Sequence, residues 1–129
     1  MRYKVPKSLL LRVCVYPSAD NSKVFVAHCL ELDLIGQGNT PKEAISELIE
    51  SIELQIEATE ESQCQLFFEA PACVWQKYKQ GRNAGRAIMQ RIVAQAQKSF
   101  ISRKRAVPEF ENVIATNNVP RQFLSVTTS

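Results

Sequence analysis

The sequence of 129 residues has no long apolar run, only four glycines and a single histidine. Its uninterrupted apolar stretches reach three or four residues, whereas a helix that crosses a bilayer needs about 20. The basic N-terminus is not followed by a long apolar segment with a small-residue cleavage site. We therefore expect a cytoplasmic protein with no signal peptide and no contact with a membrane.

The cysteines are too scattered to suggest a metal centre. Cys14, Cys29, Cys64 and Cys73 form no C-x-x-C pair, and only His28 could join them as a ligand. Structural zinc sites need four such ligands, usually at short spacings. We therefore predict no metal and no cofactor, and we interpret the thiols as reduced packing groups.

Charge is strongly segregated along the chain, although the net charge is only +3. Residues 31–69 carry one base against ten acids, whereas residues 70–108 carry nine bases and no acid. Such segregation indicates either two surfaces of opposite sign or an internal pairing that cancels them.

Alternating apolar residues predict strands over residues 9–16 and 23–30, joined by a turn rich in Pro, Ser, Asp and Asn. A third short strand over residues 33–38 would complete an antiparallel meander. A short aromatic run over residues 65–69 predicts a fourth strand, and residues 111–116 a late one.

Thr40, Pro41 and Glu43 form a complete helix start, because Thr40 and Glu43 can cap each other and proline is favoured at the first helical position. The apolar residues that follow recur at helical spacing and predict one buried face: Ile45, Leu48, Ile49, Ile52 and Ile56. The acids that share the outer face are Glu43, Glu47, Glu50 and Glu57.

Further along, Pro71 and Gly81 bound a short predicted helix, and a longer basic helix follows from about residue 83 to residue 101. The predicted fold is α+β: an antiparallel sheet of three to four strands, one long helix packed on it, and a C-terminal basic helix. We divide the chain into an α+β domain over residues 1–81, a basic helical extension over 82–108 and a tail over 109–129 with one late strand.

Part of this pattern resembles the HicB-like antitoxin family, whose members carry the motif "v-A-x-C-P-E-L-x-G-x-x-x-x-G-x-T-x-x-E-A". The residues that match it are Ala27, Cys29, Glu31, Leu32, Gly38, Thr40, Glu43 and Ala44. Leu30 stands where the motif has proline, and Asp33-Leu34-Ile35 replaces its glycine-containing turn. The resemblance covers residues 9–57, and more loosely the chain to residue 81.

The resemblance implies a β-β-β-α-β domain, a truncated RNase H-like fold without a working nuclease site. It also implies a dimer that binds and occludes a small ribonuclease toxin. On this interpretation the acidic residues would contact a basic partner, and we predict a partner-binding set of Glu31, Asp33, Glu43, Glu47 and Glu50.

Other interpretations of the charged residues stay open. The acidic helix face could simply be solvated, and the basic region from Lys77 to Arg105 could pack against it or bind DNA or RNA. The predicted nucleic-acid-binding set is Lys77, Lys79, Arg82, Arg86, Arg91, Lys104 and Arg105. A nuclease would need several converging carboxylates, which acids in separate turns do not provide, so we predict no catalytic residues.

Overall fold

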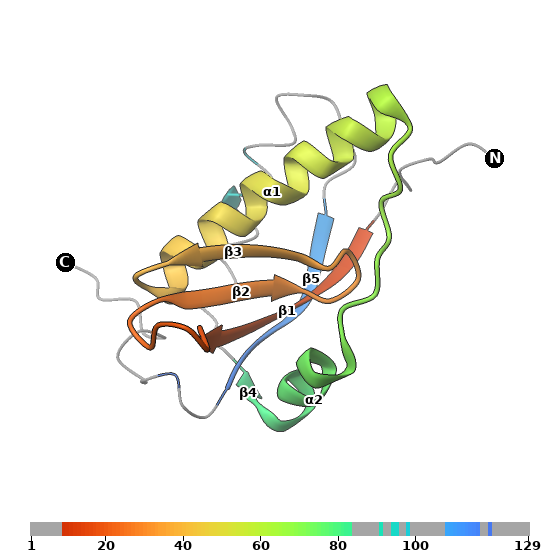
Figure 1. Ribbon diagram of the computed structural model, residues 1–129. Helices are drawn as coiled ribbons and strands as arrows, with labels where there is room; N and C mark the ends of the chain where they lie inside the picture. Colours follow the sequence, from red (N-terminus) through yellow and green to blue (C-terminus); the bar gives the residue numbers. More distant parts are fainter. Residues whose placement is uncertain are drawn as a thin grey trace.

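A computed structural model describes residues 9–83, 91, 94–95, 98, 108–116 and 119 of the chain. Its elements are β1 (Leu9–Pro17), β2 (Phe25–Cys29), β3 (Leu34–Gly38), α1 (Pro41–Ser62), α2 (Ala72–Gln80), β4 (Arg82–Asn83) and β5 (Pro108–Ala115). The strands form one sheet in the order β3-β2-β1-β5-β4 (Figure 1). The fold is therefore α+β, with a mixed sheet that is mostly antiparallel.

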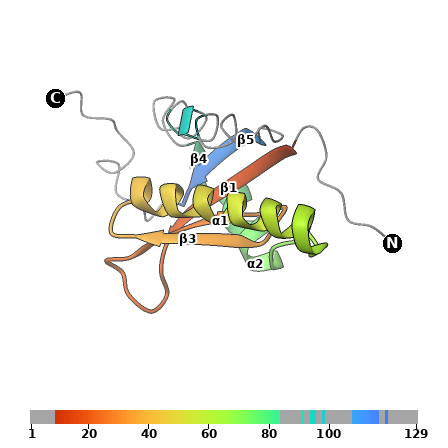
Figure 2. The same cartoon turned by 90° about the horizontal axis from the view of Figure 1, so that it is seen from above.

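β1 is the central strand, and both of its faces are covered. Leu11, Val13 and Val15 are fully buried in the core shared with α1, as their alternation in the sequence predicts. Cys14 on the opposite face is also fully buried, and it packs in a second cluster with Val74 of α2. The two helices therefore lie on opposite faces of the sheet (Figure 1 and Figure 2).

β5 joins β1 in parallel, and its register shifts between Leu11 and Arg12, where Glu111 is skipped. Side chains alternate along a strand, so one extra residue changes which of them share a face. The shift brings Phe110 and Val113 to the same side of the sheet, and both are buried in the core beneath α1. The irregular step thus lets β5 contribute two large side chains to that core.

α1 begins where the sequence predicts. Thr40 Oγ1 accepts a hydrogen bond from the Glu43 backbone N–H at 3.1 Å, and the Glu43 carboxylate accepts one from the Asn39 N–H at 2.9 Å. Pro41 occupies the first helical position. The predicted apolar stripe is buried: Ile45, Leu48, Ile49, Ile52 and Ile56.

β3 lies very close to α1, and glycine makes this approach possible. A Cβ on Gly36 would overlap the carbonyl oxygen of Ala44 and the backbone nitrogen of Leu48. Both obstacles belong to helix backbone, which cannot swing aside as a side chain can. Gly36 therefore sets the distance between the edge of the sheet and the helix above it.

The segment between α1 and α2 is extended but is not a strand, so the predicted strand over residues 65–69 is wrong. The Phe68 N–H donates to the Glu31 carbonyl and the Ala70 N–H donates to the Leu30 carbonyl. These bonds attach the segment to the turn after β2. The places beside β1 are taken by β2 and β5, so no position next to the central strand remains for this segment.

The short helix predicted between Pro71 and Gly81 is confirmed as α2, and the late strand as β5. The expectation of an antiparallel sheet is wrong in one respect, because β5 pairs with β1 in parallel. That pairing joins segments far apart in the chain, so no local pattern announces it. The predicted basic helix lies mostly outside the described residues.

None of the helices in the described part of the chain combines the length and apolar character needed to cross a bilayer.

We predict that Gly36→Ala lowers the free energy of unfolding by about 2–3 kcal/mol, because the added methyl group meets helix backbone. Urea denaturation followed by circular dichroism measures this loss. The neighbouring exposed residue supplies the control, since Gln37→Ala should change stability by less than about 0.5 kcal/mol. Equal stability of the two variants would contradict the close approach of β3 to α1.

Candidate partner-binding site

Three of the predicted partner-binding acids lie together on α1. Glu43, Glu47 and Glu50 are exposed, and their spacing places them on one face of the helix. Together with Thr40, Lys42 and Ser46 they line a shallow pocket of about 410 Å³. We call these three acids the acidic surface.

The start of α1 holds the acidic surface in place. The Thr40 cap and the bond from the Asn39 N–H to Glu43 fix the first turn of the helix. The buried stripe on the opposite face, which includes Leu48 and Ile52, holds the helix on the sheet. The carboxylates therefore project from a helix that is fixed at its start and along its buried face. Binding a partner there would cost this protein little conformational freedom.

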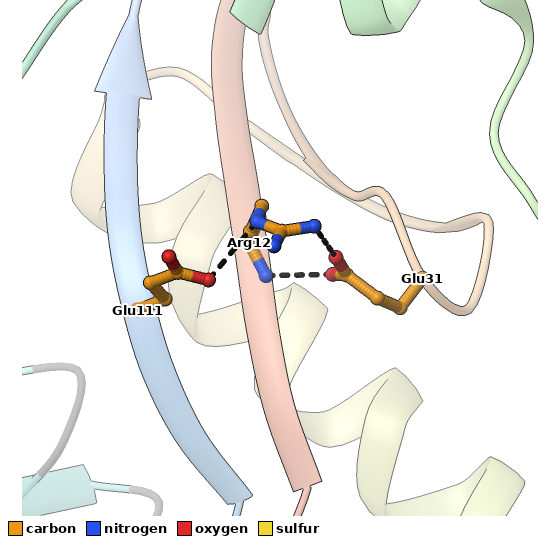
Figure 3. Close-up of polar contacts among 3 residues, drawn as sticks. All are labelled: Arg12, Glu31 and Glu111. Carbon is orange, nitrogen blue, oxygen red and sulfur yellow. Dashed lines mark hydrogen bonds and ion pairs between the residues drawn. The ribbon is translucent and has the colours of Figure 1, made fainter.

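Glu31 does not belong to the acidic surface, because its carboxylate is engaged within the fold. One oxygen accepts the backbone N–H of Arg12 at 2.7 Å, and the other pairs with the Arg12 guanidinium at 3.0 Å. Arg12 Nε also pairs with Glu111 on β5 at 3.0 Å, so the guanidinium lies between two carboxylates (Figure 3). The group thereby joins β1, β5 and the turn after β2.

The position of Glu31 has a clear cause in the strand pairing. The Leu30 N–H donates to the Arg12 carbonyl, so these residues continue the antiparallel ladder. The Leu30 carbonyl, however, accepts a hydrogen bond from the Ala70 N–H and not from the Arg12 N–H. The Glu31 carboxylate supplies the acceptor that the Arg12 N–H would otherwise lack.

Asp33 is exposed, but it too contacts the protein itself. Its carboxylate lies 2.6 Å from His28 Nε2, and His28 Nδ1 lies 2.9 Å from the Tyr16 hydroxyl. Because a carboxylate accepts, Nε2 donates, and in the neutral ring Nδ1 accepts from Tyr16. The Lys77 ammonium lies over the Tyr16 ring, 4.1 Å from its centre.

Sequence reasoning missed this chain of polar contacts. Cys29 lies in the core beneath α1 and His28 bonds to Tyr16 on the other face, as neighbours in a strand do. The pairing of Cys14 with His28 across β1 and β2 becomes visible only once the strand register is known.

The thiols on the two faces of the sheet are protected by burial. Burial raises the pKa of Cys14 from 9.0 to about 12, a shift that the nearby positive charge of Lys77 partly opposes. Burial likewise raises the pKa of Cys29 to about 12. Tyr16 also has its pKa raised to about 12, mainly by burial, with a contribution from negative charge at Cys14, Cys73 and Asp33. These groups are therefore protonated at neutral pH and are poor nucleophiles.

The predicted nucleic-acid-binding residues are only partly described. Lys77, Lys79 and Arg91 are exposed. Lys79 lines a shallow pocket of about 610 Å³ with Trp75 and Gln76. Arg82 lies on β4, and its side chain is outside the described residues, as are Arg86, Lys104 and Arg105.

No group of three or more His, Cys, Asp or Glu residues is arranged to hold a metal ion within the described ranges. Comparisons with protein-family models, curated proteins and solved structures found no match for the chain. Its function is therefore inferred from its own residues and contacts.

We predict that Glu31→Ala lowers the free energy of unfolding by about 1–3 kcal/mol, because the Arg12 N–H loses its acceptor. Glu31→Gln keeps an acceptor oxygen and should cost less. Urea denaturation of both variants tests this order. Glu111→Ala is the matched control, since it removes only the more exposed ion pair and should cost less than about 1 kcal/mol. If Glu111→Ala lowered the free energy of unfolding as much as Glu31→Ala, the ion pairs of Arg12, and not its backbone hydrogen bond, would account for the stabilisation.

We predict that a thiol reagent at pH 8 labels the exposed Cys64 and Cys73 in the folded protein and leaves Cys14 and Cys29 unmodified. Mass spectrometry of the digested protein locates the labels. In urea all four cysteines should react. Rapid labelling of Cys14 without denaturant would contradict its burial beneath α2.

Proposed function

We propose that this protein is a non-catalytic, HicB-like regulator that binds and occludes a small basic ribonuclease toxin. The observation that carries the proposal is the acidic surface, which presents three carboxylates from the first turns of one capped helix. A ribonuclease that binds RNA presents positive charge, and opposing potentials speed association and disfavour wrong partners.

The roles of the motif residues support the resemblance on which this proposal rests. Thr40 and Glu43 cap α1, and Glu31 supplies the acceptor for β1. A Cβ on Gly38 would overlap Glu43, so this glycine allows the close turn from β3 into α1. Ala44 is fully buried at the same contact. The matching residues are thus ones that this arrangement of sheet and helix needs.

Two features refine the predicted partner-binding set. Glu31 and Asp33 are engaged with Arg12 and His28, so the proposal assigns the direct contacts to Glu47, Glu50 and the Glu43 carboxylate oxygen that does not accept the Asn39 N–H. The proposal also includes a cytoplasmic location, as the sequence features predict, and a homodimer, as the family resemblance implies.

A second candidate function is nucleic-acid binding through the basic region. It is favoured by the pocket that Trp75 and Lys79 both line, since an aromatic ring and a cation in one pocket suit a base and its phosphate. Binding to duplex DNA or RNA should then weaken steeply as salt rises. Replacing Lys77 and Lys79 with alanine should flatten that dependence, and a flat response of the unmodified protein would refute this function.

We predict that the double variant Glu47→Gln, Glu50→Gln slows association with the toxin by about tenfold at low ionic strength, because it removes attractive charge. The partner to test is the product of a short, basic reading frame beside the gene, and stopped-flow kinetics with calorimetry gives rate and affinity. Glu69→Gln is the control, because Glu69 is exposed outside the acidic surface. The lack of such a neighbour, together with no binding, would refute the proposed function.

A further inference from the structure

The outer edge of β3 is a feature of the fold that the proposed function does not yet use. β3 is an edge strand of the sheet, and β2 is the strand that pairs with it in the described part of the chain (Figure 1). A strand at the end of a sheet has backbone N–H and C=O groups without a neighbouring strand, and such groups can pair with another chain.

The register shows which backbone groups face outward. Leu30 bonds to Arg12 of β1, and because the direction of bonding alternates along a strand, Cys29 and Ala27 turn their polar groups toward β3. Their partners on β3 are Leu34 and Gly36. The intervening residues therefore direct their N–H and C=O groups away from the sheet, and these are Ile35 and Gln37.

β3 lacks three features that often protect such an edge: charge, proline and an irregular step. Its sequence, Leu-Ile-Gly-Gln-Gly, contains no charged residue and no proline, and its pairing with β2 has no irregular step. The Ile35 side chain is 43% exposed. Gly36 and Gly38 allow α1 to pack closely against the strand.

The charge beside the edge indicates what could pair with it. The position of a Cβ on Gly38 falls on Glu43, so the acidic surface begins directly above the end of β3. Two copies joined in parallel through β3 would bring two acidic surfaces together, which like-charge repulsion opposes. A strand with Lys or Arg beside apolar residues would instead meet opposite charge above the edge and Ile35 on the other face.

We propose that the outer edge of β3 accepts an extended, basic segment of a partner protein as an additional strand of the sheet. This inference rests on the proposed function, because it takes the partner to be the basic toxin. It adds the backbone edge through which that partner binds. Main-chain hydrogen bonds from Ile35 and Gln37 supply affinity, and the acidic surface selects a basic sequence. A homodimer of this protein would then use another surface.

The probe is the hexapeptide Lys-Val-Lys-Val-Lys-Val, titrated into ¹⁵N-labelled protein. We expect saturable shifts of the Ile35 and Gln37 amide signals and slower hydrogen exchange at both. Two control peptides should give neither change: Glu-Val-Glu-Val-Glu-Val, and the basic peptide with every backbone nitrogen methylated. Equal binding of the methylated peptide, shifts confined to other residues, or no binding would overturn the proposal.

The matched protein variants are Ile35→Pro, which removes the outward N–H, and Ile35→Val, which keeps it. We expect Ile35→Pro to weaken peptide binding by about fivefold or more, the effect of one lost hydrogen bond, and Ile35→Val to bind normally. Circular dichroism checks that both variants fold, and the methylated peptide gives the same test on the unmodified protein. Sedimentation that shows a dimer dissolved by Ile35→Pro would overturn the proposal in favour of self-pairing.

The same variants separate this inference from the proposed function. If the toxin binds Ile35→Pro as tightly as the unmodified protein, the edge proposal fails and the regulator function stands. If the basic peptide binds the edge while the product of the neighbouring reading frame does not bind, the edge proposal stands and the regulator function fails.

Discussion

The structure depends on β1 being bonded along both edges and contributing buried side chains on both faces. β2 pairs with one edge and β5 with the other, while α1 covers the face of Leu11 and Val13 and α2 covers the face of Cys14. A strand so enclosed needs a partner for nearly every backbone polar group, because water cannot reach them. The side chain of Glu31 meets this requirement at Arg12, whose N–H it accepts.

Glu31 shows how one side chain can direct the path of a chain. By accepting the Arg12 N–H, it releases the Leu30 carbonyl to bond with Ala70. That bond holds the segment that leads into α2, and α2 in turn closes the second cluster around Cys14. The carboxylate that the sequence suggested for partner binding therefore has a structural role, and the members of the predicted set that stay exposed on α1 are Glu43, Glu47 and Glu50.

Both proposals concern the same corner of the molecule, where β3 turns into α1. Gly36 and Gly38 bring the strand and the helix together, so the acidic surface and the outer edge of β3 become neighbours. In the two proposals, charge on the helix and the outward backbone groups of the strand are complementary means of recognition, because one selects by sign and the other by extended shape. The polar contacts of Tyr16, His28 and Asp33 lie on the α2 side and stabilise the turn between β2 and β3.

The sequence by itself determined the features that depend on near neighbours. The start of α1 follows from Thr40 and Glu43, which are three residues apart, and its buried face follows from helical spacing. Only the tertiary structure decided the parallel pairing of β5, the loss of the predicted strand over residues 65–69, and the bond between Arg12 and Glu111, which are 99 residues apart in the chain. The physical reason is that capping and periodicity act over one or two helical turns, whereas the partner of a central strand is chosen by which distant segment completes its hydrogen bonds and fills its core.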